Sequence, residues 1–167
     1  MTERDAAPTP PRRVRRWPTF ALGQLYRSAH ARISADLAAV HESLSTYYVL
    51  ATLAEYGELS QQQVCDRIEM DRSDMVRLID DLEARGNVIR RRDPHDRRRY
   101  RLTLTLGGTK ALHRCEEILA AATDVVFANL AADELRTFHR LTLRALDDTE
   151  DVLHRSEDPP LPRATNA

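Results

Sequence analysis

Residues 71–86 of this chain, DRSDMVRLIDDLEARG, decide its fold. The apolar residues in this stretch recur at the i, i+3, i+4, i+7 spacing of a helix that buries one face. They are Met75, Leu78, Ile79 and Leu82. Asp71 is a typical helix N-cap residue, and Gly86 is a typical residue to follow a helix C-terminus. The stretch therefore predicts one amphipathic helix that begins after Asp71 and stops at Gly86.

The residues just before this helix predict a second, shorter helix. Ser60-Gln61-Gln62-Gln63 matches a capping box, in which the serine accepts from a backbone amide and the last glutamine accepts from the serine's own amide. Val64 and Ile68 then fall on one face of a helix that has to end near Met70. Two short helices joined by so tight a turn indicate a helix-turn-helix.

The residues after Gly86 change from a helical to an extended pattern. Val88 and Ile89 begin a run that becomes basic through Arg92, residues 93–96 (DPHD) are typical of a turn, and residues 100–105 alternate apolar and polar side chains. This pattern predicts a β-hairpin with an arginine-rich tip, which is a wing. The expected fold class is mainly α with a small β-hairpin wing: a winged helix-turn-helix with a helical dimerisation region.

Long helical patterns flank the winged segment. They cover residues 18–39, residues 46–55, a long helix after Gly107-Gly108, and a final helix whose apolar positions reach Leu153. Their apolar stripes exceed what a small winged domain can cover, which predicts a homodimer interface. The expected organisation is a flexible basic arm (1–17), a single domain (18–155) and a flexible tail (156–167). Within the domain, 18–45 and 107–155 are the dimerisation helices and 46–106 is the DNA-binding lobe.

Composition narrows the class of protein. With 167 residues, 42% hydrophobic and 31% charged, the chain is long enough for one globular domain. The net charge is −1, but residues 85–101 hold eight arginines against two acids, which is the local basic patch that phosphates require. The longest uncharged stretch, 43–54, is too short for a membrane helix, and no secretory signal is expected. Two cysteines suit a reducing cytoplasm.

This order of elements resembles the MarR-type multiple-antibiotic-resistance and ligand-responsive regulators over about residues 25–146. The resemblance rests on residues 71–86, on the wing residues 93–98 (DPHDRR) and on residues 102–105 (LTLT). It implies a cytoplasmic homodimer that binds double-stranded DNA at a pseudo-palindromic operator. The recognition helix would lie in the major groove and the wing in the minor groove. A repressor is favoured over an activator.

The candidate DNA contacts follow from these positions. Arg72, Ser73 and Arg77 are predicted at base edges, and Asp74 either caps its own helix or accepts from cytosine. Arg97 and Arg98 suit insertion into a narrow minor groove, and Arg90, Arg91 and Arg99 suit contact with phosphates. The alternative is that these arginines only solvate an exposed surface.

An effector site is predicted between the dimerisation helices and the DNA-binding lobe, as the resemblance implies. The residues expected to line it are Tyr26, His30, His41, Tyr47 and Tyr48. They would fit a small aromatic or amphipathic molecule, and core packing of the aromatic residues is the alternative. Such an effector would favour a dimer with wrongly spaced recognition helices.

Other kinds of site are disfavoured. Cys65 and Cys115 lie on or beside apolar stripes, which favours packing over redox sensing. No histidine pair has metal-binding spacing, so neither a metal nor a cofactor is predicted. No catalytic motif is present, which disfavours an enzyme. A winged helix that binds another protein instead of DNA remains the second hypothesis.

Overall fold

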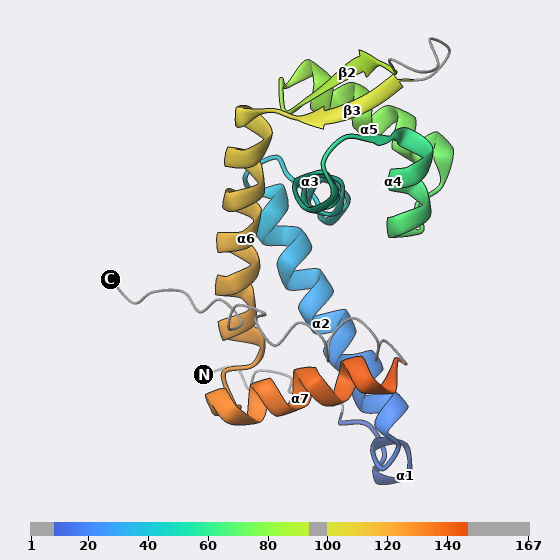
Figure 1. The fold of residues 1–167 in the computed structure, drawn as a ribbon. Helices are drawn as coiled ribbons and strands as arrows, with labels where there is room; N and C mark the ends of the chain where they lie inside the picture. Colours follow the sequence, from blue (N-terminus) through green and yellow to red (C-terminus); the bar gives the residue numbers. More distant parts are fainter. Residues whose placement is uncertain (1–8, 94–99, 147–167) are drawn as a thin grey trace.

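The computed structural model describes residues 9–93 and 100–146 (Figure 1). Its elements in chain order are α1 (Arg12–Arg15), α2 (Pro18–Ala38), α3 (Leu44–Tyr56), β1 (Leu59–Ser60), α4 (Gln61–Ile68), α5 (Arg72–Ala84), β2 (Val88–Arg92), β3 (Tyr100–Leu104), α6 (Leu106–Val126) and α7 (Ala132–Ala145). The predicted fold class is confirmed, because helices predominate and the sheet is small and antiparallel.

A single core holds α3, α4, α5 and the sheet together at the top of Figure 1. Its apolar side chains come from each of these elements and from the first turns of α6. They are Val49, Leu50, Leu53, Leu59, Val64, Cys65, Met75, Ile79, Leu82, Val88, Leu102, Ala111 and Leu112. Because the helix-turn-helix and the wing share this core, the lobe behaves as one packed unit.

The sheet contains a third strand that the sequence analysis did not predict. Its strand order is β1-β3-β2, in which Leu59 pairs with Leu102 on one side of β3 and Val88 pairs with Leu104 on the other. β1 is only two residues long, and its second residue, Ser60, is also the N-cap of α4. A two-residue strand has no alternating pattern, so a sequence pattern cannot detect it.

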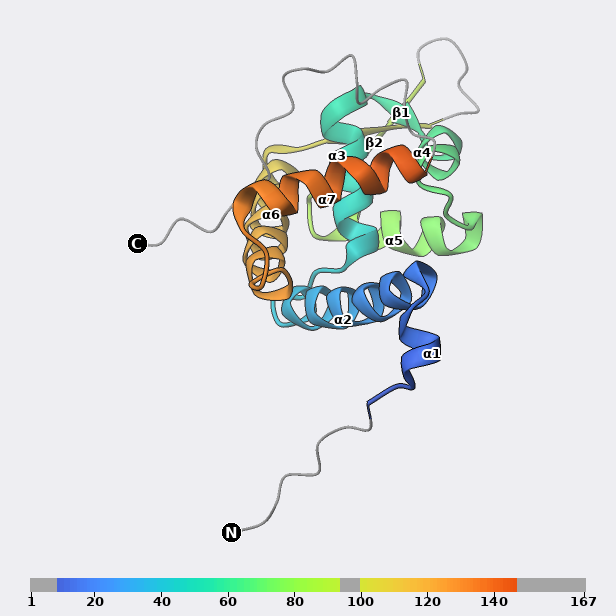
Figure 2. The same cartoon turned by 90° about the horizontal axis from the view of Figure 1, so that it is seen from below.

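Helix α6 follows the wing directly and runs down the molecule beside α2 (Figure 1). It begins at Leu106, earlier than the Gly107-Gly108 boundary suggested, because the Thr105 hydroxyl accepts from the Gly108 amide at 3.0 Å and caps the helix. Figure 1 places α7 at the end of the molecule opposite the wing, and Figure 2, seen from that end, shows α7 crossing in front of α3.

The chain's ends are described only in part. A four-residue helix, α1, lies within the segment predicted as a basic arm, and α2 begins at the expected Pro18. The last helix is described to Ala145, so its predicted continuation to Leu153 lies outside the described residues. Among the described helices, none combines the length and apolar character that crossing a membrane requires.

Candidate nucleic-acid interface and effector pocket

Helix α5 presents one face to solvent because its other face is locked into the core. Met75, Ile79 and Leu82 are fully buried. Asp71 caps the helix by accepting from the Ser73 amide at 2.7 Å, and this contact together with the Ser73 hydroxyl lowers the pKa of the Asp71 carboxyl. At the other end, Asn87 donates to the Leu82 carbonyl in a Schellman turn. A side-chain cap therefore defines the start of α5, and backbone hydrogen bonds define its end.

The three residues predicted at base edges, together with Asp74, lie on the exposed, N-terminal half of α5. Arg72, Ser73 and Asp74 occupy its first turn, and the Arg77 side chain is 79% exposed. The cap belongs to Asp71, while the Asp74 carboxylate lies 4.0 Å from the Arg77 guanidinium. Asp74 is thus placed to orient Arg77.

One arginine that was predicted to contact phosphate is exposed to solvent on the wing strands. Arg91 is exposed on β2 and pairs in register with Arg101 on β3. The Arg101 guanidinium donates to Asp93 at 2.8 Å, which raises the Arg101 pKa and ties the two strands together. Arg97, Arg98 and Arg99 lie outside the described residues.

Arg90, also predicted to contact phosphate, is half-buried and is paired with two acids of α5. Its guanidinium pairs with Glu83 at 2.6 Å and with Asp80. Burial opposes the charge of Arg90, but these two carboxylates outweigh that effect and raise its pKa. The sequence analysis missed this pairing, although the acids at positions 80 and 83 share one face of the helix. The geometry assigns Arg90 to joining β2 to α5.

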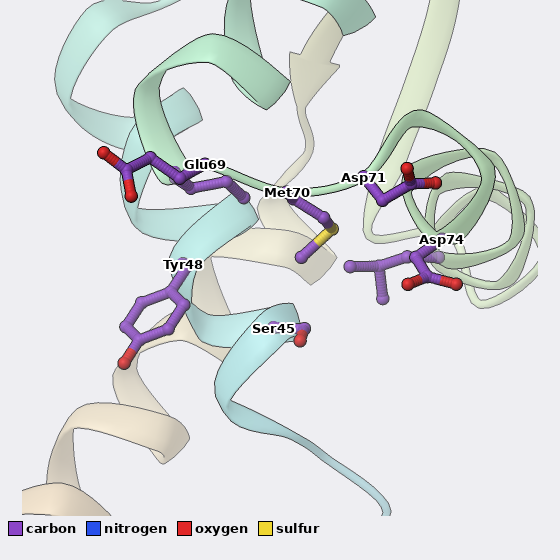
Figure 3. A pocket seen from close by; sticks show the side chains of 8 residues that line it. Ser45, Tyr48, Glu69, Met70, Asp71 and Asp74 are labelled. Carbon is purple, nitrogen blue, oxygen red and sulfur yellow. The ribbon is translucent and has the colours of Figure 1, made fainter.

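A pocket of about 530 Å³ opens beside the start of α5 (Figure 3). Ser45 and Tyr48 line it from α3, and residues of the α4–α5 turn and of α5 complete it. These residues are Ile68, Glu69, Met70, Asp71, Asp74 and Leu78. The pocket therefore combines an apolar floor with three carboxylates, and it adjoins the half of α5 that carries the predicted base contacts.

Of the five residues predicted to bind an effector, only Tyr48 lines this pocket. Tyr47 packs against the core, and burial raises its pKa. Tyr26 and His30 form a ring pair, 5.4 Å between centroids, on the exposed side of α2. The His41 carbonyl accepts from Arg85 at 3.0 Å. The structure does not bring these five residues together in one site.

The thiols have the environment of packing residues. Cys65 and Cys115 are both buried and free. Burial, and then the charge of Glu42, raises the pKa of Cys115 to about 11, so the thiol is protonated at neutral pH. Within residues 9–93 and 100–146, no group of three or more His, Cys, Asp or Glu side chains is arranged to hold a metal ion.

The core, the exposed half of α5 and the wing beside it define a winged helix-turn-helix protein. The profile of the MarR family matches residues 43–99. The chain is 30% identical to the HTH-type transcriptional regulator PrsX of Escherichia coli over 122 residues, 72% of this chain and 74% of PrsX. It is 34% identical to a putative transcriptional regulatory protein for the hcr operon of Thauera aromatica over 98 residues, and it spans 59% of that protein's length.

Solved structures show the same fold. The PcaV transcriptional regulator from Streptomyces coelicolor superimposes with a TM-score of 0.65 at 29% identity, covering 81% of this chain and 99% of PcaV. A mutant MarR from E. coli in complex with operator DNA superimposes with a TM-score of 0.64 at 20% identity, covering 75% of this chain and 91% of that one. This chain belongs to the MarR family of transcriptional regulators, which are not enzymes.

Proposed function

We propose that this protein is a cytoplasmic repressor that binds a pseudo-palindromic operator as a homodimer and releases it when a small molecule binds. The observation that carries the proposal is the exposed face of α5, with Arg72, Ser73 and Arg77, next to a wing whose strands and tip are rich in arginine. A helix N-terminus of this kind fits the major groove, and arginines at a hairpin tip fit the minor groove.

The DNA contacts divide by chemistry. Arg77 and Arg72 would recognise base edges, Arg97 and Arg98 would enter the minor groove, and Arg91 and Arg99 would neutralise phosphates. Arg90 is removed from the predicted set, because its guanidinium is already paired with Asp80 and Glu83. The E. coli MarR mutant that shares this fold was solved in complex with operator DNA, which supports DNA as the proposed partner of this chain.

The homodimer is supported by apolar side chains left in solvent at the end opposite the wing. Leu141 and Leu146, at the C-terminal end of α7, are 42% and 70% exposed, and Leu22 and Tyr26 on α2 are also exposed. Apolar residues gathered on terminal helices are typical of a subunit interface. A two-fold dimer would present two α5 helices to successive major grooves.

The pocket beside α5 is the site we propose for the effector. Met70, Leu78 and Tyr48 offer apolar contact, while Glu69, Asp71 and Asp74 favour a ligand that donates hydrogen bonds or carries positive charge. Because two of its lining residues, Asp74 and Leu78, belong to α5 and a third, Asp71, caps it, a bound ligand would displace the recognition helix. An aromatic or amphipathic molecule of this polarity fits the pocket.

Fluorescence anisotropy of the protein on duplex from its own upstream intergenic region, titrated across salt, tests the DNA proposal. We expect saturable binding that weakens steeply as salt rises, and Arg98→Ala should weaken it by roughly ten-fold. Arg140→Ala, an exposed arginine on α7, is the matched control and should bind like wild type. Salt-insensitive behaviour, or equal binding by both variants, would instead favour the protein-binding winged helix.

A thermal-shift screen of aromatic and amphipathic amines tests the effector site. A compound that raises the melting temperature of wild type should lose this effect in Tyr48→Ala and keep it in Tyr26→Ala, because only Tyr48 lines the pocket. A compound equally effective on both variants would place the effector elsewhere.

A further inference from the structure

A buried carboxylate connects three separate segments of the chain. Glu42 lies in the loop between α2 and α3, and its side chain is only 2% exposed. One carboxylate oxygen accepts from Arg85 Nη1 at 3.0 Å, and the other accepts from Arg114 Nη2 at 3.5 Å. Arg85 is the C-cap of α5, and Arg114 belongs to α6. Glu42 therefore links the end of the recognition helix to α6.

Arg85 has a fixed geometry, because it is held from three directions. Besides Glu42, its guanidinium donates to the His41 carbonyl at 3.0 Å and pairs with Asp81 of α5 at 3.0 Å. A guanidinium is planar, so several simultaneous partners specify its orientation as well as its position. The Schellman turn at Gly86 then transmits that position to the backbone at the end of α5.

Burial makes the arrangement sensitive to the charge of Glu42. A carboxylate removed from water is stable only while its oxygens are paired, and loss of one partner leaves an uncompensated charge. If Glu42 is neutralised, as in Glu42→Gln, Arg85 and Arg114 lose the negative charge between them, and only one acceptor oxygen remains for two guanidinium groups that repel each other. The contacts of α5 with α3 and β2 would remain, so the recognition helix would stay folded. Its C-terminal end, however, would be less restrained relative to α6.

We propose that Glu42 is a positioning residue that sets the distance between the two recognition helices of the dimer, and with it the half-site spacing that the protein accepts. This inference rests on the proposed dimeric DNA-binding function. α6 continues toward the end of the molecule where α2 and α7 expose apolar side chains, which is the proposed dimer interface. Fixing the position of α5 relative to α6 therefore fixes its position in the dimer. Glu42 itself touches no DNA in this mechanism.

The test measures affinity against half-site spacing. Duplexes carry two copies of one half-site whose centre-to-centre spacing changes in single base pairs around one helical turn, about 10 base pairs. Wild type, Glu42→Gln and the control Asp36→Asn are compared by anisotropy, with circular dichroism to verify folding. Asp36 forms an exposed i, i+4 pair with Arg32 on α2. Asp36→Asn therefore removes a carboxylate without changing the contacts of Glu42 with Arg85 and Arg114.

We expect wild type and Asp36→Asn to prefer one spacing by about ten-fold over its neighbours two base pairs away, and Glu42→Gln to lose or shift that preference. Binding to random-sequence DNA at low salt should be the same for all three proteins. Arg85→Lys keeps the positive charge but loses the planar guanidinium, so it should also reduce the preference for one half-site spacing. This variant takes the place of Glu42→Gln if Glu42→Gln does not fold.

The possible failures are distinguishable. If wild type shows no salt-dependent duplex binding, the proposed function fails and this inference fails with it. If wild type has a spacing preference that folded Glu42→Gln retains unchanged, only this inference is wrong and Glu42 serves stability alone. Hydrogen exchange adds an independent check: amides of residues 82–87 should exchange faster in Glu42→Gln than in Asp36→Asn.

Discussion

Arginine shows most directly how neighbours decide what a side chain does in this protein. Arg85, Arg90 and Arg101 are paired with acids of neighbouring segments, whereas Arg77 and Arg91 extend into solvent. A guanidinium already bound to carboxylates has few donors left for phosphate. At this scale the structure separates residues that join elements from residues that are free to meet DNA.

A buried thiol gives the first prediction at the residue scale. Burial and the charge of Glu42 raise the pKa of Cys115 from 9.0 to about 11. Below pH 9 the thiol is protonated in both states, so the stabilisation is complete. Between pH 9 and 11 the unfolded state loses its proton first, and the free energy of unfolding should fall by about 2 kcal/mol.

Urea denaturation of wild type and Cys115→Ala across pH 8–11 provides the measurement. The alanine variant lacks this ionisation, so the stability difference between the two proteins should shrink as pH rises. Tyr47, whose pKa burial also raises, is present in both proteins, and the Cys115 charge is the smallest of the four causes that raise its pKa. A difference that stays constant with pH would show that the Cys115 thiol ionises equally in the two states.

At the scale of elements, the start of α6 packs closely against the turn that follows α5. Gly108, in the first turn of α6, lies so near the backbone of Asn87 that an added Cβ would stand 2.1 Å from the Asn87 carbonyl oxygen and 2.5 Å from Leu104 Cδ1. Backbone cannot move aside as a flexible side chain can. This contact packs the start of α6 against both the turn after α5 and strand β3 of the wing.

Gly108→Ala should therefore lower the free energy of unfolding by about 2 kcal/mol or more, because the added methyl group would overpack the contact of α6 with Asn87 and Leu104. Thermal or urea denaturation measures this. The control is Gly23→Ala in α2, where the nearest atom is Arg27 Nη1 at 3.6 Å. That change should raise stability by about 1 kcal/mol, because alanine is the better helix former. Equal effects at both glycines would contradict the close contact.

At the scale of the whole molecule, the two ends differ in character. The lobe with α5 and the wing encloses the apolar core cluster, whereas the opposite end leaves apolar side chains of α2 and α7 in solvent. A protein of 19.1 kDa with such a surface is expected to associate through it. Under the proposed function, DNA affinity would depend on this distant interface, because a dimer binds two half-sites together.

Leu141→Asp on α7 should shift the protein from twice 19.1 kDa toward 19.1 kDa in sedimentation equilibrium, since a charge would be buried in an apolar interface. Arg140→Asp changes the neighbouring, exposed position of the same helix and should leave the dimer intact. Specific operator binding should be lost in the first variant only. A dimeric Leu141→Asp protein would place the interface elsewhere.

From the sequence alone, the helix-turn-helix and the paired wing strands could be predicted, because their signals are local. The caps at Ser60 and Asp71, the stop at Gly86 and the alternation in residues 100–105 each depend on a few neighbouring residues. Family membership followed from the same short stretches, and the comparisons confirm it.

Only the tertiary structure decided which polar residues meet. Glu42 and Arg85 are separated by 43 residues, and Glu42 and Arg114 by 72, so no pattern along the chain connects them. For the same reason, the pocket beside α5 includes Tyr48 but not the other four predicted effector residues. Helices and hairpins follow from the periodicity of the backbone, whereas contacts between distant side chains follow from how those elements pack.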